Sequence, residues 1–233
     1  SDEKQVLNNL LKILVSKRQI TEKDLDTVLE ITIQKLVELV KAQAITIYSV
    51  TKDNCISFTN VYFSEELYRG NDELRDAYRS KVERLRSITL RRGQGIVGKV
   101  IESGESYISL DTQNDPNFFS GVDQETGFQT KSMITVPVTT DRVIGAIQII
   151  NKNPPQGPGL FTDRDRQLLE EVADYSARII QKVHQPEIKM ADTELAYYLS
   201  RLTDHEYMEI GDDFVPDVKL LNLVGEENVK KYL

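Results

Sequence analysis

The chain of 233 residues has one cysteine, no tryptophan and no long apolar run. A single cysteine, Cys55, excludes an internal disulfide and a cysteine-rich zinc site. A membrane-spanning helix needs about 20 consecutive apolar residues, and the sequence has no such stretch. The first residues also lack the charged-then-apolar pattern of a secretory signal. We therefore expect a cytoplasmic protein without membrane insertion.

Basic residues are outnumbered by acidic ones, 29 Lys and Arg against 37 Asp and Glu, so the formal net charge is −8. This balance makes a general nucleic-acid binder an unfavourable interpretation. Residues 184–233 carry most of the net negative charge, since their five basic and eleven acidic residues give −6 of the total of −8. The shift indicates a domain boundary near residue 184. With 39% hydrophobic and 28% charged residues, the composition is typical of a globular protein.

Hydrophobic periodicity predicts a mixture of helices and strands. Apolar residues at helical spacing predict helices over residues 4–16, 24–40 and 162–183, the last opened by a capping-box pattern from Thr162 to Asp165. The expected strands span residues 44–50, 55–63, 87–90, 107–110, 133–138 and 143–150, with a charged helical insertion over residues 64–86. The predicted domains are an N-terminal helix (1–20), a central domain (21–183), a linker (184–191) and a small α/β tail (192–233).

The region from Gly93 to Phe161 carries the most specific signal. Its segments GIVGKV, DPNFF, GVDQETGFQT and VIGAIQIINK resemble the GAF domain, most closely the regulatory GAF domains of cyclic-nucleotide phosphodiesterases. The resemblance implies an α+β fold with a central six-stranded antiparallel sheet, helices on one face and a ligand lid on the other. It also implies a sensor that requires no cofactor, binds cyclic AMP or cyclic GMP, and is not itself an enzyme.

The resemblance further implies which residues meet the ligand and which brace the lid. The implied ligand-binding residues are Ile96, Val97, Phe119, Thr126, Thr130, Gln148, Phe63 and Ser64. The family's lid brace falls on Asn151, Lys152, Phe161 and Asp165, with Arg166 where the family has Glu. In that family the lysine and the aspartate form a salt bridge away from the ligand. No aspartate falls clearly at the base-reading position, so guanine selectivity is not implied.

Simpler interpretations exist for each of these signals. The glycines can serve tight turns alone, Thr126 and Thr130 can cap helices, and Phe119 can be a core residue. Cys55 is interpreted as a small buried hydrophobic residue. The sequence has no Walker loop, and no cysteine or histidine stands at a readable catalytic or metal-binding spacing. A ligand sensor is therefore weighed against a protein-interaction scaffold, and an enzyme of GAF type comes third.

Two further expectations concern partners. The helices over residues 24–40 and 162–183 have wide apolar faces, which predicts a parallel homodimer that changing Leu168 or Leu169 to Asp would break. The tail pattern DTELAYYLSRLTDHEYMEI followed by VKLLNLVGEENVKKYL weakly resembles the N-terminal domain of type II secretion and type IV pilus ATPases. That resemblance implies a link to secretion or pilus machinery, and the abrupt C-terminus implies a fragment of a longer protein.

Overall fold

The computed structural model describes residues 22–153 and 160–184. The expected N-terminal helix, the linker from residue 185 and the tail over 192–233 lie outside the described residues. The chain divides into two compact units, residues 33–174 and the remaining residues, with the boundary inside the first and last described helices. The sheet and the candidate site belong to the unit of residues 33–174.

Helices and strands follow the order that the hydrophobic pattern predicts. They are α2 (Glu22–Val40), β1 (Ala42–Val50), β2 (Ile56–Phe63), η1 (Glu65–Leu67), α3 (Asp72–Arg86), β3 (Thr89–Leu90), α4 (Gly95–Ser103), β4 (Tyr107–Ser109), η2 (Thr112–Asn114), α5 (Gly121–Thr126), β5 (Met133–Thr139), β6 (Val143–Lys152) and α6 (Asp163–His184). All six expected strands are present. The strand expected over residues 87–90 is reduced to two residues, because Ser87 and Ile88 still donate hydrogen bonds to the end of α3.

The six strands form one sheet in the order β3-β2-β1-β6-β5-β4. Each neighbouring pair is antiparallel, which confirms the expected α+β fold class. Alternation along β1 sends Ala44, Thr46 and Tyr48 to the face that bears the candidate site, while the buried Ile45 and Ile47 point to the other face. The sheet is thus buried on both sides.

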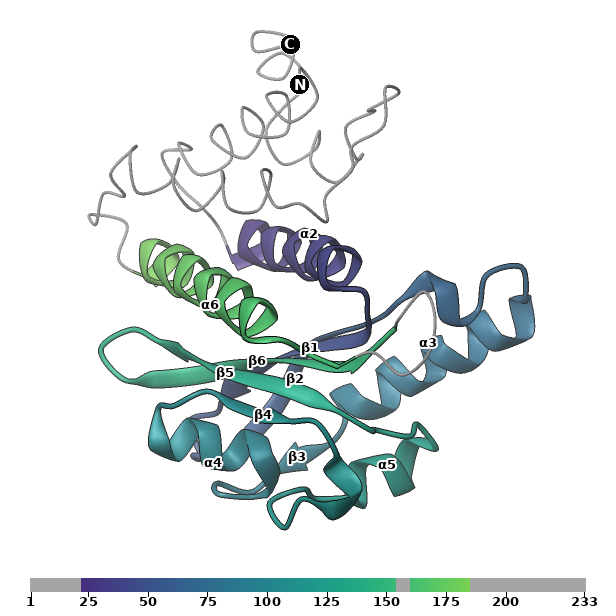
Figure 1. The fold of residues 1–233 in the computed structure, drawn as a ribbon. Helices are drawn as coiled ribbons and strands as arrows, with labels where there is room; N and C mark the ends of the chain where they lie inside the picture. The colour runs from purple at the N-terminus through teal and green to yellow at the C-terminus, as the bar shows by residue number, and fades with distance from the viewer. Residues whose placement is uncertain (1–21, 154–159, 185–233) are drawn as a thin grey trace, which may run out of the picture. The chain divides into compact units, whose positions relative to one another are not determined.

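The parts of α2 and α6 that fall within residues 33–174 lie against one face of the sheet (Figure 1). Within the unit of residues 33–174 their apolar positions are almost fully buried, namely Ile33, Leu36, Val37, Val40, Leu168, Leu169, Val172 and Ala173. Leu168 and Leu169 therefore belong to the core of the chain itself. Changing either to Asp would disrupt folding, so these two residues are the wrong ones to test the expected homodimer, which stays a prediction.

The opposite face carries α4 and α5, and α3 packs on β2 at one end (Figure 1). The predicted insertion is thus an ordered helix whose residue Leu85 joins the core beneath it. Cys55 is half-buried at the end of the β1–β2 turn, just before β2 begins at Ile56, so it is not the buried strand residue that the sequence predicts. No helix in the described ranges combines the length and the hydropathy that a membrane span requires.

Candidate functional site: a pocket between the sheet and α4–α5

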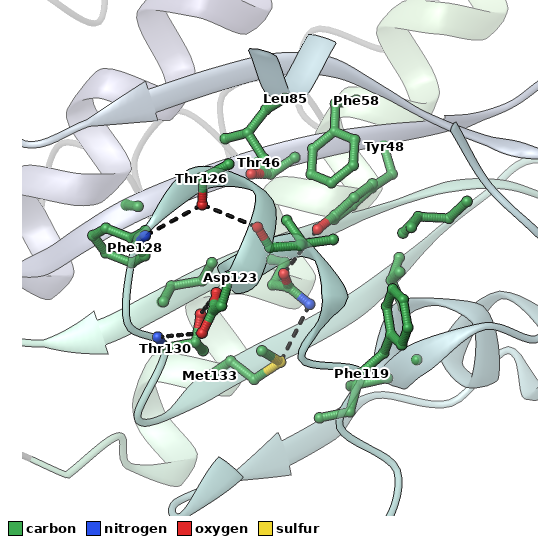
Figure 2. A pocket seen from close by; sticks show the side chains of 18 of the residues that line it. Thr46, Tyr48, Phe58, Leu85, Phe119, Asp123, Thr126, Phe128, Thr130 and Met133 are labelled. Atoms are coloured by element: carbon green, nitrogen blue, oxygen red, sulfur yellow. Dashed lines mark hydrogen bonds between the residues drawn. The ribbon is translucent and has the colours of Figure 1, made fainter. Parts of the chain in front are cut away.

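A pocket lies between residues of β1, β2 and β6, on the sheet face opposite α2 and α6, and the helices α4 and α5 (Figure 2). Most of its wall is apolar, and its polar side chains come from five segments. The polar lining residues are Thr46, Tyr48, Gln94, Asp123, Thr126, Thr130 and Gln148. Such a combination of an apolar wall with a few convergent polar groups is typical of small-molecule sites.

The floor of the pocket is a chain of hydrogen bonds across three strands. The Tyr48 hydroxyl donates to Gln148 Oε1 (2.9 Å), and Gln148 Nε2 donates to Thr135 Oγ1 (2.8 Å) and to Met133 Sδ (3.3 Å). Burial raises the pKa of Tyr48 well above its usual value, so the phenol stays a neutral donor. The chain therefore fixes the amide of Gln148, with its nitrogen toward Met133.

The lid over this floor, which we define as residues 111–132, contains α5. Asp123 of α5 accepts hydrogen bonds from Thr130 N (2.7 Å) and from Thr130 Oγ1 (2.8 Å). The Thr126 hydroxyl donates to Val122 O (3.0 Å) and accepts from Phe128 N (3.3 Å). Both threonines thus stabilise the lid itself while facing the pocket, as Figure 2 shows. Asp123 is the one charged side chain among the described residues that line the pocket.

Helix α4 starts at the rim of the pocket. Its first residue, Gly95, has a left-handed φ of 70°, and its N-cap residue Gln94 makes no side-chain cap hydrogen bond. Instead, Gln94 Oε1 accepts from Arg91 N (3.0 Å). The first N–H groups of this nine-residue helix, including those of Ile96 and Val97, therefore have no side-chain cap. Groups of this kind favour an anion.

Phe119 closes the rim between the two helices. A Cβ atom added at Gly121 would lie 2.2 Å from Phe119 Cζ, and one added at Gly95 would lie 3.2 Å from Phe119 Cβ. The two glycines at the starts of α5 and α4 therefore make room for this side chain. The ring is still 40% exposed, and it also borders an outer groove formed with Leu90, Gln94 and Val122.

The pocket is small in this conformation. Its cavity measures about 70 Å³, which is room for a few water molecules. Sites for drug-sized ligands measure about 300–1,000 Å³. Binding of a ligand the size of a nucleotide therefore requires the lid to move outward from the sheet.

The structure brings together most of the residues that the sequence singled out. Of the eight expected ligand-binding residues, seven line the pocket: Phe63, Ile96, Val97, Phe119, Thr126, Thr130 and Gln148. Ser64 does not line it, because its hydroxyl caps η1 by accepting from Glu66 N (3.3 Å). Sequence reasoning missed Asp123 and Tyr48. Asp123 stands three residues before Thr126 in the quoted GVDQETGFQT segment, which was the available signal.

The expected lid brace forms as a buried ion pair. Lys152 Nζ lies 2.7 Å from Asp165 Oδ2, with side chains 15% and 0% exposed. The same Asp165 oxygen accepts from Thr162 N (2.9 Å), while Thr162 Oγ1 accepts from Asp165 N (3.2 Å). The predicted capping box is therefore complete, and its aspartate also holds the end of β6.

Asn151 of β6 binds the last residues of the lid, where the chain returns to the sheet. Its Oδ1 accepts from Lys131 N (2.7 Å) and Ser132 N (3.1 Å). Its Nδ2 donates to Gln129 O (2.9 Å) and Gln43 Oε1 (3.0 Å). Asn151 has a φ of 56°, a left-handed conformation that asparagine tolerates better than most residues. The amide therefore ties β1, β6 and the lid together.

A second polar cluster holds the loop that carries Phe119. Asp115 Oδ1 accepts from Asn117 N (2.9 Å), and the Tyr107 hydroxyl donates to Asp115 Oδ2 (2.8 Å). Burial alone would raise the pKa of Asp115. The hydrogen bonds from Asn117, Ser109 and Tyr107, together with the charge of Lys99, outweigh burial and lower this pKa below its ordinary value of 3.8.

We expect Asp115→Asn to reduce the free energy of unfolding by about 1 kcal/mol at pH 7. A carboxyl with a lowered folded-state pKa stabilises the fold fully above its ordinary pKa, and the contribution disappears as the pH falls through the lowered pKa. The difference between the wild type and Asp115→Asn in urea unfolding should therefore shrink below pH 3.8. A difference that stays constant between pH 7 and pH 3 would contradict this account.

No group of three or more His, Cys, Asp or Glu side chains in residues 22–153 and 160–184 could hold a metal ion. The expectation that the chain is not an enzyme stays a prediction. The arrangement supplies hydrogen-bond donors, acceptors and an apolar wall, which are the means to bind a small molecule.

Comparison with known proteins extends these observations. The dual 3',5'-cyclic-AMP and -GMP phosphodiesterase 11A of Takifugu rubripes is 36% identical over 80 residues, which cover 34% of this chain and 9% of that protein. The probable 3',5'-cyclic phosphodiesterase pde-5 of Caenorhabditis elegans is 27% identical over 170 residues, covering 69% of this chain and 22% of that protein. The chain therefore spans less than a quarter of the length of either relative.

A solved structure supports the fold. The GAF domain of the Acinetobacter phosphoenolpyruvate-protein phosphotransferase superposes with a TM-score of 0.53 at 17% identity, covering 79% of this chain and 96% of that one. The resemblance of residues 192–233 to secretion and pilus ATPases finds no support. A family model described as the GAF domain matches residues 22–181. The chain therefore belongs to the GAF domain family of regulatory sensor domains.

Proposed function

We propose that this GAF domain senses a cyclic nucleotide, cyclic AMP or cyclic GMP, and passes the binding event to an effector attached to it in the cytoplasm. The observation that carries the proposal is the pocket between the sheet and α4–α5. It joins an aromatic rim at Phe119, a helix N-terminus at Gly95 and polar groups on the floor and lid. The likeness to two cyclic-nucleotide phosphodiesterases supports the same ligand class.

The chemistry of the pocket matches the parts of such a ligand. A cyclic phosphate carries one negative charge, and no lysine or arginine is among the described residues that line the pocket. The uncapped N–H groups of α4 then become the favourable place for the phosphate. The flat base can pack on Phe119, while the carboxylate of Asp123, which lines the pocket, offers an acceptor to its edge.

Thermal unfolding with added nucleotide tests the proposal. A ligand at 100 times its dissociation constant adds about 2.7 kcal/mol to the stability of the folded state, which raises the Tm of a domain of this size by about 5–10 °C. We expect such a shift with cyclic AMP or cyclic GMP. Absence of a shift with either nucleotide at millimolar concentration would contradict the proposal and favour a scaffold function.

Substitutions of the lid threonines then test the site. Thr126→Val and Thr130→Val keep the shape of each side chain and remove the hydroxyl. We expect each to weaken nucleotide binding by about threefold to tenfold, since a neutral hydrogen bond contributes about 0.5–1.5 kcal/mol. Thr139→Val, at the exposed end of β5 outside the pocket, is the control. Equal affinity in all three variants would place the ligand elsewhere.

A further inference from the structure

Helix α3 reaches the lid with two cationic side chains from outside the pocket. Lys81 Nζ donates to the carbonyl oxygen of Thr126 (2.5 Å), the last residue of α5. Arg84 Nη2 and Nε both donate to Glu125 Oε2, at 2.6 Å and 3.1 Å. Both contacts join segments more than 40 residues apart in the sequence. They therefore fix the position of α5 relative to α3.

The contacts fall where α5 most needs support. The helix has only six residues, and a helix this short is unstable by itself in water. Its C-terminus ends at Gly127, which has a left-handed φ of 70°. The ammonium group of Lys81 lies against this end, where the helix dipole favours a positive charge.

An aromatic contact continues the same connection beyond α5. The ring of Phe128 packs on Phe63 with centroids 5.3 Å apart, and Phe63 packs on Tyr78 of α3 at 5.0 Å. Tyr78 and Lys81 are three residues apart on α3, so they lie on neighbouring positions of one helix face. One face of α3 therefore contacts α5 and the segment that follows it.

Helix α5 forms the wall that must move when a ligand enters. It supplies Val122, Asp123 and Thr126 to the pocket lining, and the cavity of about 70 Å³ is too small for a nucleotide while this wall is in place. Whatever holds α5 against α3 therefore opposes opening of the lid, for entry and for release.

We propose that Lys81 and Arg84 are positioning residues that hold α5 closed over the pocket, so that α3 sets the rate at which a bound ligand leaves. The proposal rests on the proposed ligand-sensing function, but its structural part concerns the free protein. The competing interpretation is a surface ion pair without effect on the lid, since the Arg84 and Glu125 side chains are 60% and 50% exposed. Such pairs typically change a folding or opening equilibrium by less than about fivefold. The test must therefore detect coupling between the two helices.

Amide hydrogen exchange of residues 121–128 in the free protein measures that coupling. We expect Arg84→Glu and Glu125→Arg each to speed exchange by about threefold to tenfold, because each places like charges together. The double variant Arg84→Glu/Glu125→Arg restores the pair with reversed polarity and should return exchange to within about twofold of the wild type. Lys81→Met should speed exchange by about fivefold, since it removes the charge-assisted bond at the helix end.

Arg79→Gln is the matched control, because Arg79 lies on the same helix and pairs only loosely with Asp76 of α3 (3.9 Å). It should leave the exchange of residues 121–128 unchanged. Failure of the charge swap to restore protection, or equal effects of Arg79→Gln and Arg84→Glu, would overturn the proposal. If the charge swap restores protection, the contact between α3 and α5 in the free protein is supported even when no nucleotide binds. In that case only the proposed ligand is wrong.

The second part of the proposal, that α3 sets the rate of ligand release, is tested by measuring how fast the nucleotide that stabilises the wild type dissociates. We expect Lys81→Met and Arg84→Glu to raise its dissociation rate by the same factors as the exchange rates, and the swapped pair to restore the slow rate. Neither residue lines the pocket, and Lys81 also lies outside the adjoining groove that Arg84 borders. Lost ligand contacts therefore do not explain a change caused by Lys81→Met. Unchanged dissociation in both variants, with tight binding in the wild type, would overturn the role of α3 in ligand release.

Discussion

Replacing Asp165 by Ala is expected to lower the free energy of unfolding by about 3–5 kcal/mol. The Asp165 side chain is fully buried and holds Lys152 at 2.7 Å. Its removal takes this carboxylate from a mostly buried ammonium group, and breaking a buried ion pair by removing one partner is costly. The same change removes the hydrogen bond from Thr162 N, which opens the capping box of α6. Chemical denaturation followed by far-ultraviolet circular dichroism measures the loss, since the chain has no tryptophan.

Two neighbouring substitutions separate the ion pair from the cap. Thr162→Ala removes one capping hydrogen bond and keeps the pair with Lys152, so we expect a loss of only about 1 kcal/mol. Asp163→Ala removes the exposed pair between Asp163 and Arg166 and should cost less than about 1 kcal/mol. An Asp165→Ala variant no less stable than Thr162→Ala would refute the role of the buried ion pair.

Replacing Gly98 by Ala is expected to cost about 3 kcal/mol or more, at the upper end of what overpacking causes. A Cβ atom at this position would lie 2.4 Å from the carbonyl carbon of Gly93 and 2.8 Å from its Cα. Both are backbone atoms, so no side-chain rotation can relieve the overlap. The first turn of α4 would have to separate from the turn before it, and the rim of the pocket would change with it.

Gly70→Ala is the calibration for this prediction. Gly70 has a left-handed φ of 74°, but no atom lies within 4 Å of the position of an added Cβ. Its substitution should therefore cost only the backbone strain of about 1–2 kcal/mol. The same denaturation measurement compares the two variants. Equal stability of Gly98→Ala and Gly70→Ala would mean that the turn at Gly93 yields freely.

Local sequence pattern was sufficient for the elements of the fold. The hydrophobic pattern predicted the ends of β1, β2, β5 and β6 to within one or two residues. Successive side chains of a strand point to opposite faces of the sheet, so the residues that face a core are apolar at every second position, or at every position where both faces are buried. The capping box at Thr162 was readable for the same reason, since both of its hydrogen bonds join residues three apart. The burial of Cys55 was overestimated, because the exposure of a residue at a strand end depends on which side chains pack over it.

The site was predictable in its location and less so in its contacts. The glycines before α4 and the GVDQETGFQT segment identified the region, but the sequence left Thr126 and Thr130 open between ligand contacts and helix caps. Their hydroxyls bond to Val122 O and Asp123 within the lid. Asp123 was missed because its role depends on the fold of the lid around it.

The sequence by itself determined the strands, the helices and the capping box, because each depends on spacing along the chain. The family followed from the resemblance of four segments to the GAF domain, and the family model confirms it. Only the tertiary structure decided that Tyr48 and Gln148 meet on the pocket floor, 100 residues apart, and that α3 holds α5 through Lys81 and Arg84. These contacts depend on the register of β1 against β6 and on the packing of α3 on β2. Register and packing arise from the whole core, so no local pattern encodes them.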